Sequence, residues 1–223
     1  MGRVRGKSWM QEHVADAYVK RARAEGMRSR AAYKLAQIAE RDRLLKPGMI
    51  VVDLGAAPGG WSQVAAERVA PRGRVIALDL LEMAPMRGVT FVRGDLRDHV
   101  VIAELERALG AEKADLVLSD IAPNISGIAV TDQARMLELA ELALDFAQKH
   151  LKPQGNFLVK AFQGASFEEF LKKLRSGFTA VAVRKPEASR GRSTELYLVA
   201  KGVRARAATR LVCGRAAPRA KRV

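Results

Sequence analysis

The fold is decided by the stretch Met49-Ile50-Val51-Val52-Asp53-Leu54-Gly55-Ala56-Ala57-Pro58-Gly59-Gly60-Trp61-Ser62-Gln63. Its apolar first part predicts a buried strand, and its glycine-rich middle predicts a tight loop that leads into a helix. In an open α/β sheet, ligands bind outside the carboxyl ends of the strands, at the point where the strand order reverses. We therefore expect the loop at 55–60 to border a ligand site.

Apolar runs alternate with helical patterns from Met49 to Ala200. This alternation predicts a single α/β domain, Rossmann-like, with a seven-stranded, mostly parallel sheet and helices on both faces. The expected strands are 49–54, 74–79, 89–92, 115–119, 156–161, 179–184 and 195–200, the last two as an antiparallel pair. The expected helices are 28–44, 61–69, 96–109, 132–150 and 166–174. Within 28–44 the apolar face comprises Ala32, Leu35, Ile38 and Ala39, with Arg30, Lys34 and Arg41 outside it.

The 223 residues, of which 48% are hydrophobic, suit one domain with short appendages. Nearly all of the net charge of +15 lies at the two ends: positions 1–34 hold nine Lys or Arg against three Asp or Glu, and positions 201–223 hold eight against none. Such ends favour a polyanion, because Lys and Arg that neutralise phosphates release counterions. Solvated tails, or a basic surface facing acidic lipid, are the alternatives.

These observations divide the chain into a basic RNA-binding segment (1–27), the domain (28–202) and a basic tail (203–223) that we expect to be disordered until bound. No run approaches the roughly 18 consecutive apolar residues that cross a bilayer, so we expect a cytoplasmic protein. The single cysteine, Cys213, lacks a partner for a disulfide or a thiolate metal site, and the sequence predicts no metal. Nothing in it indicates an obligate dimer, so we expect a monomer.

The glycine loop does not have the dinucleotide spacing G-x-G-x-x-G, and Pro58 lacks the backbone N–H that a pyrophosphate would need. A cofactor without phosphates fits better, and we expect S-adenosylmethionine. Asp79, at the end of the second strand, would accept hydrogen bonds from its ribose hydroxyls. Asp95, after the third strand, would accept one from the adenine amine. For both, a turn or helix-capping role is the alternative.

Three segments carry a resemblance to a known family: 53–63, Ser119-Asp120-Ile121-Ala122-Pro123-Asn124 and Val159-Lys160-Ala161-Phe162-Gln163-Gly164. They closely resemble the FtsJ/RrmJ (RlmE) family of Rossmann-like ribose 2′-O-methyltransferases, which use S-adenosylmethionine. The likeness runs from about 9 to 202 and includes 26–30 and 183–186. It is closest to the bacterial branch, which methylates a uridine ribose in 23S ribosomal RNA within the assembled large subunit.

The resemblance implies a catalytic K-D-K-E tetrad, which falls on Lys34, Asp120, Lys160 and Glu195. It also implies cofactor contacts at Gly59, Trp61, Asp79, Asp95 and Asp120. Trp61 is equally well explained as a core residue at the start of a helix. Taken singly, a lysine at a strand end or on a polar helix face is typical of a solvated surface, so these assignments depend on the motifs occurring together.

The expected chemistry explains the tetrad. A sulfonium methyl group is already activated, so the difficulty is to deprotonate a ribose hydroxyl. A lysine acts as a base only when it is neutral, and burial or a neighbouring cation lowers its pKa from about 10.4. We assign Lys160 as the general base, with Lys34 lowering its pKa or holding the 2′-oxygen. Asp120 would orient the lysine and offset the sulfonium charge, and Glu195 would position a lysine or the ribose.

Two alternatives to a ribosomal RNA methyltransferase stay open at this point. One keeps the fold and the reaction but changes the acceptor to transfer RNA or a messenger RNA cap. The other is a non-catalytic ribosome-assembly factor that binds the cofactor only structurally. Basic residues at Lys20, Arg21, Arg23, Arg28 and Arg30 would draw RNA phosphates toward Lys34 in all three cases.

Overall fold

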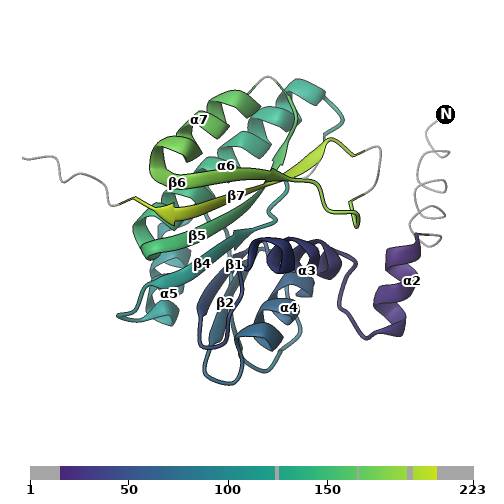
Figure 1. Cartoon of the computed structure of the whole chain (residues 1–223), viewed down its shortest axis with the longest axis vertical. Helices are drawn as coiled ribbons and strands as arrows, with labels where there is room; N and C mark the ends of the chain where they lie inside the picture. The colour runs from purple at the N-terminus through teal and green to yellow at the C-terminus, as the bar shows by residue number, and fades with distance from the viewer. Residues whose placement is uncertain (1–15, 124–125, 165, 190–192, 205–223) are drawn as a thin grey trace, which may run out of the picture.

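A computed structural model describes residues 16–123, 126–164, 166–189 and 193–204 (Figure 1). They form one seven-stranded sheet with the order β3-β2-β1-β4-β5-β7-β6. The strands are β1 (Ile50–Leu54), β2 (Arg74–Asp79), β3 (Val89–Arg93), β4 (Ala114–Ser119), β5 (Leu151–Phe162), β6 (Phe178–Arg184) and β7 (Glu195–Val203). β7 runs antiparallel to both β5 and β6, whereas the pairs from β3 to β5 are parallel. The mostly parallel sheet and its closing antiparallel pair are thus confirmed.

Helices cover both faces of the sheet, as Figure 1 shows. They are α2 (Ala17–Ala24), α3 (Ala31–Asp42), α4 (Gly60–Val69), α5 (His99–Leu109), α6 (Ala129–His150) and α7 (Phe167–Gly177). α3 and α4 pack on one face, in a core that includes Leu35, Trp61 and Tyr197. α5, α6 and α7 pack on the other, in a core that includes Leu105 and Phe157. This arrangement confirms the predicted α/β class.

The central strand β1 is buried along its whole length. Val51 belongs to the core under α3 and α4, and Val52 to the core under α5 to α7. Successive side chains of a strand point to opposite faces, so a strand covered on both sides must be apolar at consecutive positions. This explains the continuous apolar run that identified the strand, and it leaves the following loop at the edge where ligands bind.

The predicted apolar face of α3 is confirmed: Ala32, Leu35, Ile38 and Ala39 are at most 6% exposed. The helix is shorter than the expected 28–44. It starts at Ala31, because the segment before it turns away to contact α4, where the backbone N–H of Arg28 donates to Oε1 of Gln63 at 3.0 Å. It ends at Asp42, followed by Arg43 in the left-handed conformation.

The start of β5 also differs from the prediction. The strand expected at 156–161 begins at Leu151, opposite Ala114, and therefore contains the turn-forming residues Lys152-Pro153-Gln154-Gly155. The register then shifts between Ala114 and Leu116, and Gln154 has a φ of 66°. The turn residues therefore form an irregularity that keeps pairing with β4 rather than a break before the strand.

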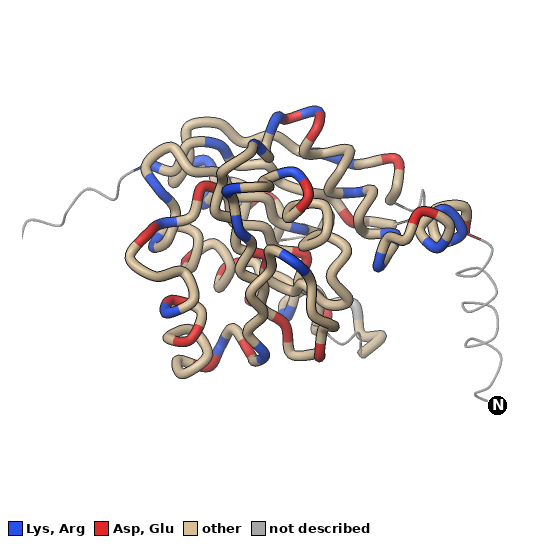
Figure 2. The backbone as a smooth tube through the Cα atoms, turned by 90° about the horizontal axis from the view of Figure 1, so that it is seen from below, with Lys and Arg blue, Asp and Glu red and all other residues tan. Residues whose placement is uncertain are grey.

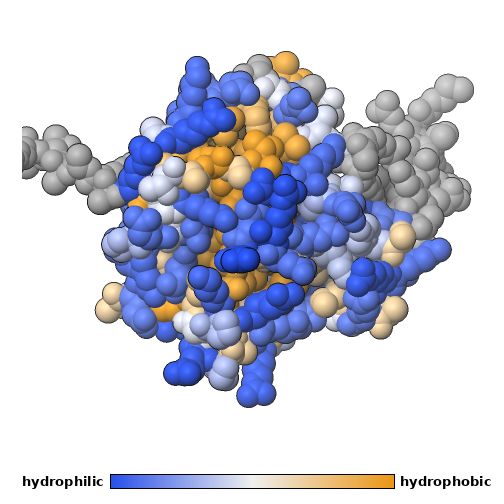
Figure 3. Space-filling view, viewed as in Figure 1, coloured by the Kyte–Doolittle hydropathy of each residue, from blue (hydrophilic) through white to orange (hydrophobic). Residues whose placement is uncertain are grey.

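α2 lies beside the main body and packs on α3 through Ala22, Tyr33 and Ala188. Figure 2 shows that Lys and Arg are interspersed with Asp and Glu over the body, as the nearly balanced composition of the middle of the chain predicts. In the space-filling view, hydrophilic side chains surround apolar atoms that gather over the β6 and β7 end of the sheet (Figure 3). No helix among the described residues is long and apolar enough to cross a membrane. Of the tail expected to be disordered, 203–223, two residues are ordered: Val203 belongs to β7, and the backbone N–H of Arg204 donates to the carbonyl of Gly177 at 2.8 Å. Residues 205–223 lie outside the described residues.

Candidate active site

The loop between β1 and α4 lies against the residues that follow β4. Gly55 has a φ of +80°, and a Cβ atom there would lie 2.7 Å from Cγ1 of Ile121. Gly59 has a φ of +106°, and its Cβ atom would lie 2.9 Å from both Arg28 Cδ and Met83 Sδ. A side chain at either position would be strained and obstructed. Glycine is required here because the loop is packed closely on both sides.

A cavity of about 620 Å³ opens beside this loop. It lies where the sheet order reverses between β1 and β4, the position at which the loop sequence predicts a ligand. Three of the acids assigned to the cofactor line the cavity: Asp79, Asp95 and Asp120. Gly55 and Ala57 line it from the loop. The structure thus brings strand-end acids from three parts of the chain around one space.

Two of these acids already hold neighbouring groups. Asp79 accepts the backbone N–H of Ala57 at 2.9 Å and that of Leu81 at 2.8 Å, so it fixes the loop as well as facing the cavity. Asp95 accepts two hydrogen bonds from the guanidinium of Arg97, at 3.0 Å and 2.6 Å. These hydrogen bonds and the Arg97 charge hold the pKa of Asp95 below its ordinary value, although burial alone would raise it. The Asp95 carboxylate therefore faces the cavity in ionised form.

Gly59 and Trp61 are not among the residues that line the cavity. The Trp61 side chain is 3% exposed and donates from its indole N–H to the carbonyl of Ala31 at 2.9 Å. Its ring packs against Tyr197, with 5.7 Å between centroids. The sequence offered two roles for Trp61, and the structure places its side chain in the core. Contacts from Gly59 and Trp61 to a cofactor stay predictions from the resemblance.

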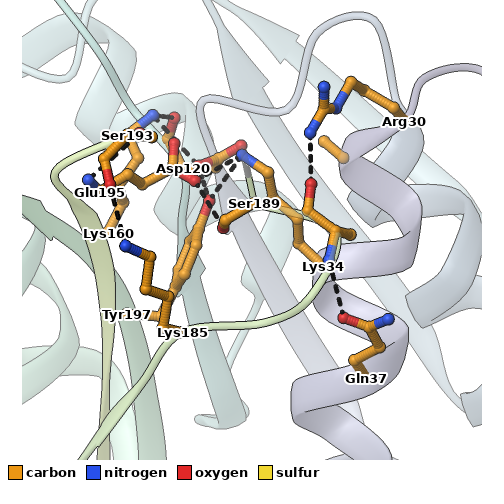
Figure 4. A network of polar contacts seen from close by, with 12 residues as sticks. Arg30, Lys34, Gln37, Asp120, Lys160, Lys185, Ser189, Ser193, Glu195 and Tyr197 are labelled. Atoms are coloured by element: carbon orange, nitrogen blue, oxygen red, sulfur yellow. Dashed lines mark hydrogen bonds and ion pairs between the residues drawn. The ribbon is translucent and has the colours of Figure 1, made fainter. Parts of the chain in front are cut away.

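The four tetrad residues come together at the same edge of the sheet (Figure 4). Lys160 Nζ lies 3.1 Å from Oδ1 of Asp120 and donates to the Asp120 carbonyl at 2.6 Å. Lys34 Nζ donates to Oε1 of Glu195 at 2.6 Å. The four side chains are between 7% and 19% exposed. The site therefore contains two lysine–acid pairs that are largely shielded from water.

Strand alternation explains why these side chains face one another. Leu158 belongs to the core under α3, so Lys160, two residues further along β5, points to the same face. Tyr197 belongs to that core as well, and Glu195 precedes it by two residues on β7. α3 covers this face and carries Lys34 over the strand ends. Residues 161 positions apart in sequence thereby form an ion pair.

Tyr197 is a site residue that the sequence analysis missed. Its side chain is fully buried, and its hydroxyl donates to Oδ1 of Asp120 at 3.1 Å. The same hydroxyl accepts from Lys34 Nζ at 3.2 Å. The phenol thus links the two lysine–acid pairs. The alternation that starts at Glu195 is the signal that would have identified it, because residues two apart on β7 share a face.

Burial and charge oppose each other at Glu195 and reinforce each other at Tyr197. Burial raises the pKa of Glu195, but the charge and hydrogen bond of Lys34, with a further contribution from the Lys160 charge, leave that pKa below its ordinary value. At Tyr197, burial and the nearby charges of Asp120 and Glu195 all raise the pKa, which lies well above the usual range. At neutral pH the site therefore presents an ionised Glu195 and a protonated phenol that can donate.

A family model described as FtsJ-like methyltransferase matches residues 27–203, which include the cofactor-side loop and all four tetrad positions. The chain belongs to this family. The Rossmann-like methyltransferase fold expected from the sequence is thereby confirmed.

Curated relatives of this FtsJ-like methyltransferase share more than half of their residues with it. A protein of Nitrosospira multiformis, named ribosomal RNA large subunit methyltransferase E, is 60% identical over 198 residues, which cover 89% of this chain and 96% of the relative. A protein of the same name from Azoarcus is 61% identical over 193 residues, covering 86% and 94%. A crystal structure from Plasmodium falciparum, provisionally named a ribosomal RNA methyltransferase, has a TM-score of 0.71 at 30% identity and covers 79% of this chain and 98% of its own.

In this FtsJ-like methyltransferase each lysine of the tetrad is paired with its own acid. Lys34 binds Glu195 and Lys160 binds Asp120, with the Tyr197 hydroxyl between the pairs. The sequence analysis expected the two lysines to act on each other as like charges. In the structure both lysines lower the pKa of Glu195. The like-charge effect of Lys34 on Lys160 stays a prediction.

Two arginines expected to face RNA phosphates bind within the methyltransferase domain instead. Arg30 forms an ion pair with Asp16, donates to the carbonyl of Ala188 and is 14% exposed. Arg28 donates to the carbonyl of Ala84 at 2.6 Å and to the next carbonyl along. The basic residues exposed on α2 are Lys20, Arg21 and Arg23. Tertiary contacts explain why Arg28 and Arg30 differ from the prediction. Acceptors from segments distant in sequence bind these two residues but do not reach the basic residues of α2.

Proposed function

We propose that this chain transfers a methyl group from S-adenosylmethionine to the 2′-hydroxyl of a uridine ribose in 23S ribosomal RNA of the large ribosomal subunit, acting as a monomer in the cytoplasm. The observation that carries the proposal is the juxtaposition of Lys160 and Asp120 with Lys34 and Glu195, next to the acid-lined cavity. The curated relatives, named as ribosomal RNA large subunit methyltransferases, support the choice of RNA.

The cavity suits S-adenosylmethionine because its lining matches the charge of that molecule. The cofactor carries a sulfonium and an ammonium and has no phosphate. Asp79 would accept from the ribose hydroxyls, Asp95 from the adenine amine, and Asp120 would offset the sulfonium charge. The glycine loop admits close approach of backbone groups. Bound there, the cofactor supplies an electrophilic methyl group. The residues of this chain then have to orient the acceptor and remove its proton.

Lys160 is the general base in this proposal. In its neutral form, Nζ would take the proton of the 2′-hydroxyl as the oxygen bonds to the methyl carbon and the methyl–sulfur bond breaks, which would leave S-adenosylhomocysteine. The ammonium that results is stabilised by the Asp120 carboxylate at 3.1 Å and the Asp120 carbonyl at 2.6 Å, which both accept from it. Lys34, fixed by Glu195 and Tyr197, holds the 2′-oxygen by donating to it. In this arrangement a single atom, Lys160 Nζ, accepts the proton.

RNA contacts are assigned to the basic ends, residues 1–27 and 203–223. Within the described part of these ends, α2 presents Lys20, Arg21 and Arg23 on its exposed side. Phosphate contacts give affinity without reading sequence, so they would hold a structured RNA while the tetrad selects a ribose. Residues 1–15 and 205–223 lie outside the described residues.

The proposal is tested by methyl transfer from labelled S-adenosylmethionine to large subunits that lack ribose methylation. Lys160→Met removes the base while keeping a similar side-chain length, and we expect transfer to fall by at least about 100-fold. Lys152→Met is the matched control, because Lys152 lies at the start of the same strand and pairs with Asp115. Free transfer RNA and capped RNA serve as alternative acceptors. Transfer to either in preference to large subunits, or full activity of Lys160→Met, would refute the proposal.

A further inference from the structure

The turn that leads from β6 toward β7 is held at a single residue, Ala188. The turn is closed by the backbone N–H of Ser189, which donates to the carbonyl of Pro186 at 2.9 Å. Within it, Ala188 is fully buried and packs against Tyr33 and Ala22. The segment is therefore a structured part of the site wall on the side of α3, as Figure 4 shows.

α3 binds both polar groups of Ala188. Oε1 of Gln37 accepts the Ala188 N–H at 3.2 Å, and the guanidinium of Arg30 donates to the Ala188 carbonyl. Arg30, Lys34 and Gln37 are spaced as one stripe of a helix, at i, i+4 and i+7. The helix that supplies the tetrad lysine thus also fixes the neighbouring turn, on either side of that lysine.

This β6–β7 turn also contacts the tetrad. Ser189 follows Ala188 directly, is 8% exposed, and donates from its hydroxyl to Oε1 of Glu195 at 3.1 Å. This is the same carboxylate oxygen to which Lys34 donates. We propose that Ser189 is a positioning residue for methyl transfer. In this proposal, Arg30 and Gln37 set the Ser189 hydroxyl against Glu195 by holding the backbone N–H and carbonyl of Ala188.

The surroundings of Arg30 favour this role over a contact with RNA. Asp16 at the start of α2 neutralises its charge, and the side chain is 14% exposed. A phosphate would have to displace the Asp16 carboxylate, whose side chain is 12% exposed. The hydrogen bond to Ala188 uses a second edge of the planar guanidinium, which lysine cannot reproduce because its ammonium is a single point of charge.

The inference rests on the proposed function, because it assigns a role in the same reaction. A tetrad without the Ser189 hydrogen bond keeps its chemical groups but loses part of its geometry. Misplacement of about 1 Å can reduce turnover about 100-fold. We expect Ser189→Ala to lower kcat by about tenfold, with KM for the large subunit and for S-adenosylmethionine unchanged. Ser189→Thr, which restores the hydroxyl, is expected to recover most of that loss.

Ser176→Ala is the matched control for Ser189→Ala. Its hydroxyl donates to the carbonyl of Lys173 at 2.7 Å on the exposed side of α7, far from the tetrad in sequence. This variant should keep the wild-type kcat. If Ser189→Ala also keeps it, or if Ser189→Thr is folded and no more active than Ser189→Ala, the hydroxyl has no positioning role and the proposal is wrong.

Arg30→Lys separates positioning from RNA binding. We expect kcat to fall about tenfold and the Ala188 amide to exchange its hydrogen faster, while affinity for the large subunit keeps its dependence on salt. A phosphate contact would give the opposite pattern, with kcat and the exchange at Ala188 unchanged, because lysine keeps the positive charge that binds a phosphate. That pattern would overturn the proposal. The exchange experiment needs no substrate, so it stays decisive even if the wild-type protein methylates a different RNA.

Discussion

The hydroxyl of Tyr197 donates to Oδ1 of Asp120 at 3.1 Å, the same oxygen that lies 3.1 Å from Lys160 Nζ. On its other side the hydroxyl accepts from Lys34 at 3.2 Å. One buried phenol therefore connects the two halves of the site. Its raised pKa keeps the proton on the oxygen, so the donor to Asp120 persists over the whole range of pH in which the enzyme is expected to work.

Tyr197→Phe should uncouple the two lysine–acid pairs. The ring that packs on Trp61 is retained, but Asp120 loses a donor and Lys34 loses an acceptor in a buried site. We expect a loss of about 1–3 kcal/mol in unfolding free energy and a fall in kcat of about tenfold or more. Single-turnover methyl transfer and urea unfolding measure the two effects. Tyr33→Phe, which removes a hydroxyl bound to Glu25 next to α2, is the control and should keep its activity.

Asp79→Asn should weaken cofactor binding. Asp79 uses one oxygen for the N–H of Ala57 and the other for that of Leu81, and an amide can accept only one of them. Loss of a hydrogen bond to a charged group corresponds to about a tenfold to hundredfold rise in Kd. Calorimetric titration with S-adenosylmethionine measures it. Asp98→Asn is matched, since Asp98 caps the N–H of Val100 away from the cavity, and unchanged affinity in Asp79→Asn would contradict the assignment.

Much of the fold could be predicted because local patterns determine it. The continuous apolar run of β1 and the periodic apolar face of α3 depend on neighbours a few residues apart, and both are where the sequence placed them. The ends of the elements were less predictable. β5 begins at Leu151 because pairing with β4 overrides the turn residues that follow it.

The candidate site could be predicted only in part. The strand-end positions of Asp79 and Asp120 follow from the order of strands, whereas nothing in sequence spacing pairs Lys34 with Glu195, and that assignment came from the resemblance. Tyr197 could have been predicted as a site residue, because it lies two residues after Glu195 on the same strand and therefore shares its face. Arg30 was not: its position outside the apolar face of α3 predicts a solvated charge, and only the tertiary contacts with Asp16 and Ala188 give it an internal role.

Gly55→Ala should destabilise the fold through the loop that borders the cavity. The residue has a positive φ, and the added Cβ would lie 2.7–2.8 Å from three atoms of Ile121, two of them backbone. We expect a loss of about 2–4 kcal/mol, combining the left-handed conformation with overpacking. Gly48→Ala, with a φ of +86° and nothing within 4 Å of the added Cβ, should lose only about 1–2 kcal/mol. Equal losses in the two variants, measured by urea unfolding, would show that Ile121 can move away.

Asp53 makes the stability of the domain depend on pH. It is fully buried, Oδ2 accepts from the hydroxyl of Ser62 at 2.6 Å, and Oδ1 has no hydrogen-bond partner among the described residues. Burial raises the pKa of Asp53 to about 7. The charges of Asp120 and Asp79 act in the same direction, and the hydrogen bond from Ser62 acts in the opposite one. In the unfolded chain, Asp has a pKa of about 3.9. The folded state therefore binds a proton more tightly than the unfolded state.

Because of this difference, the contribution of Asp53 to stability is fully present below pH about 4 and is lost as the pH rises to about 7, at up to about 1.4 kcal/mol per pH unit. Asp53→Asn removes the titration while keeping an acceptor for Ser62. Its unfolding free energy relative to the wild-type protein should therefore increase steadily between pH 4 and 7 and level off above that range. Urea unfolding of both proteins across this range measures the difference. A constant offset between the two curves would mean that Asp53 has the same pKa in both states, and a difference that grows toward acid would mean that its pKa is lowered by folding.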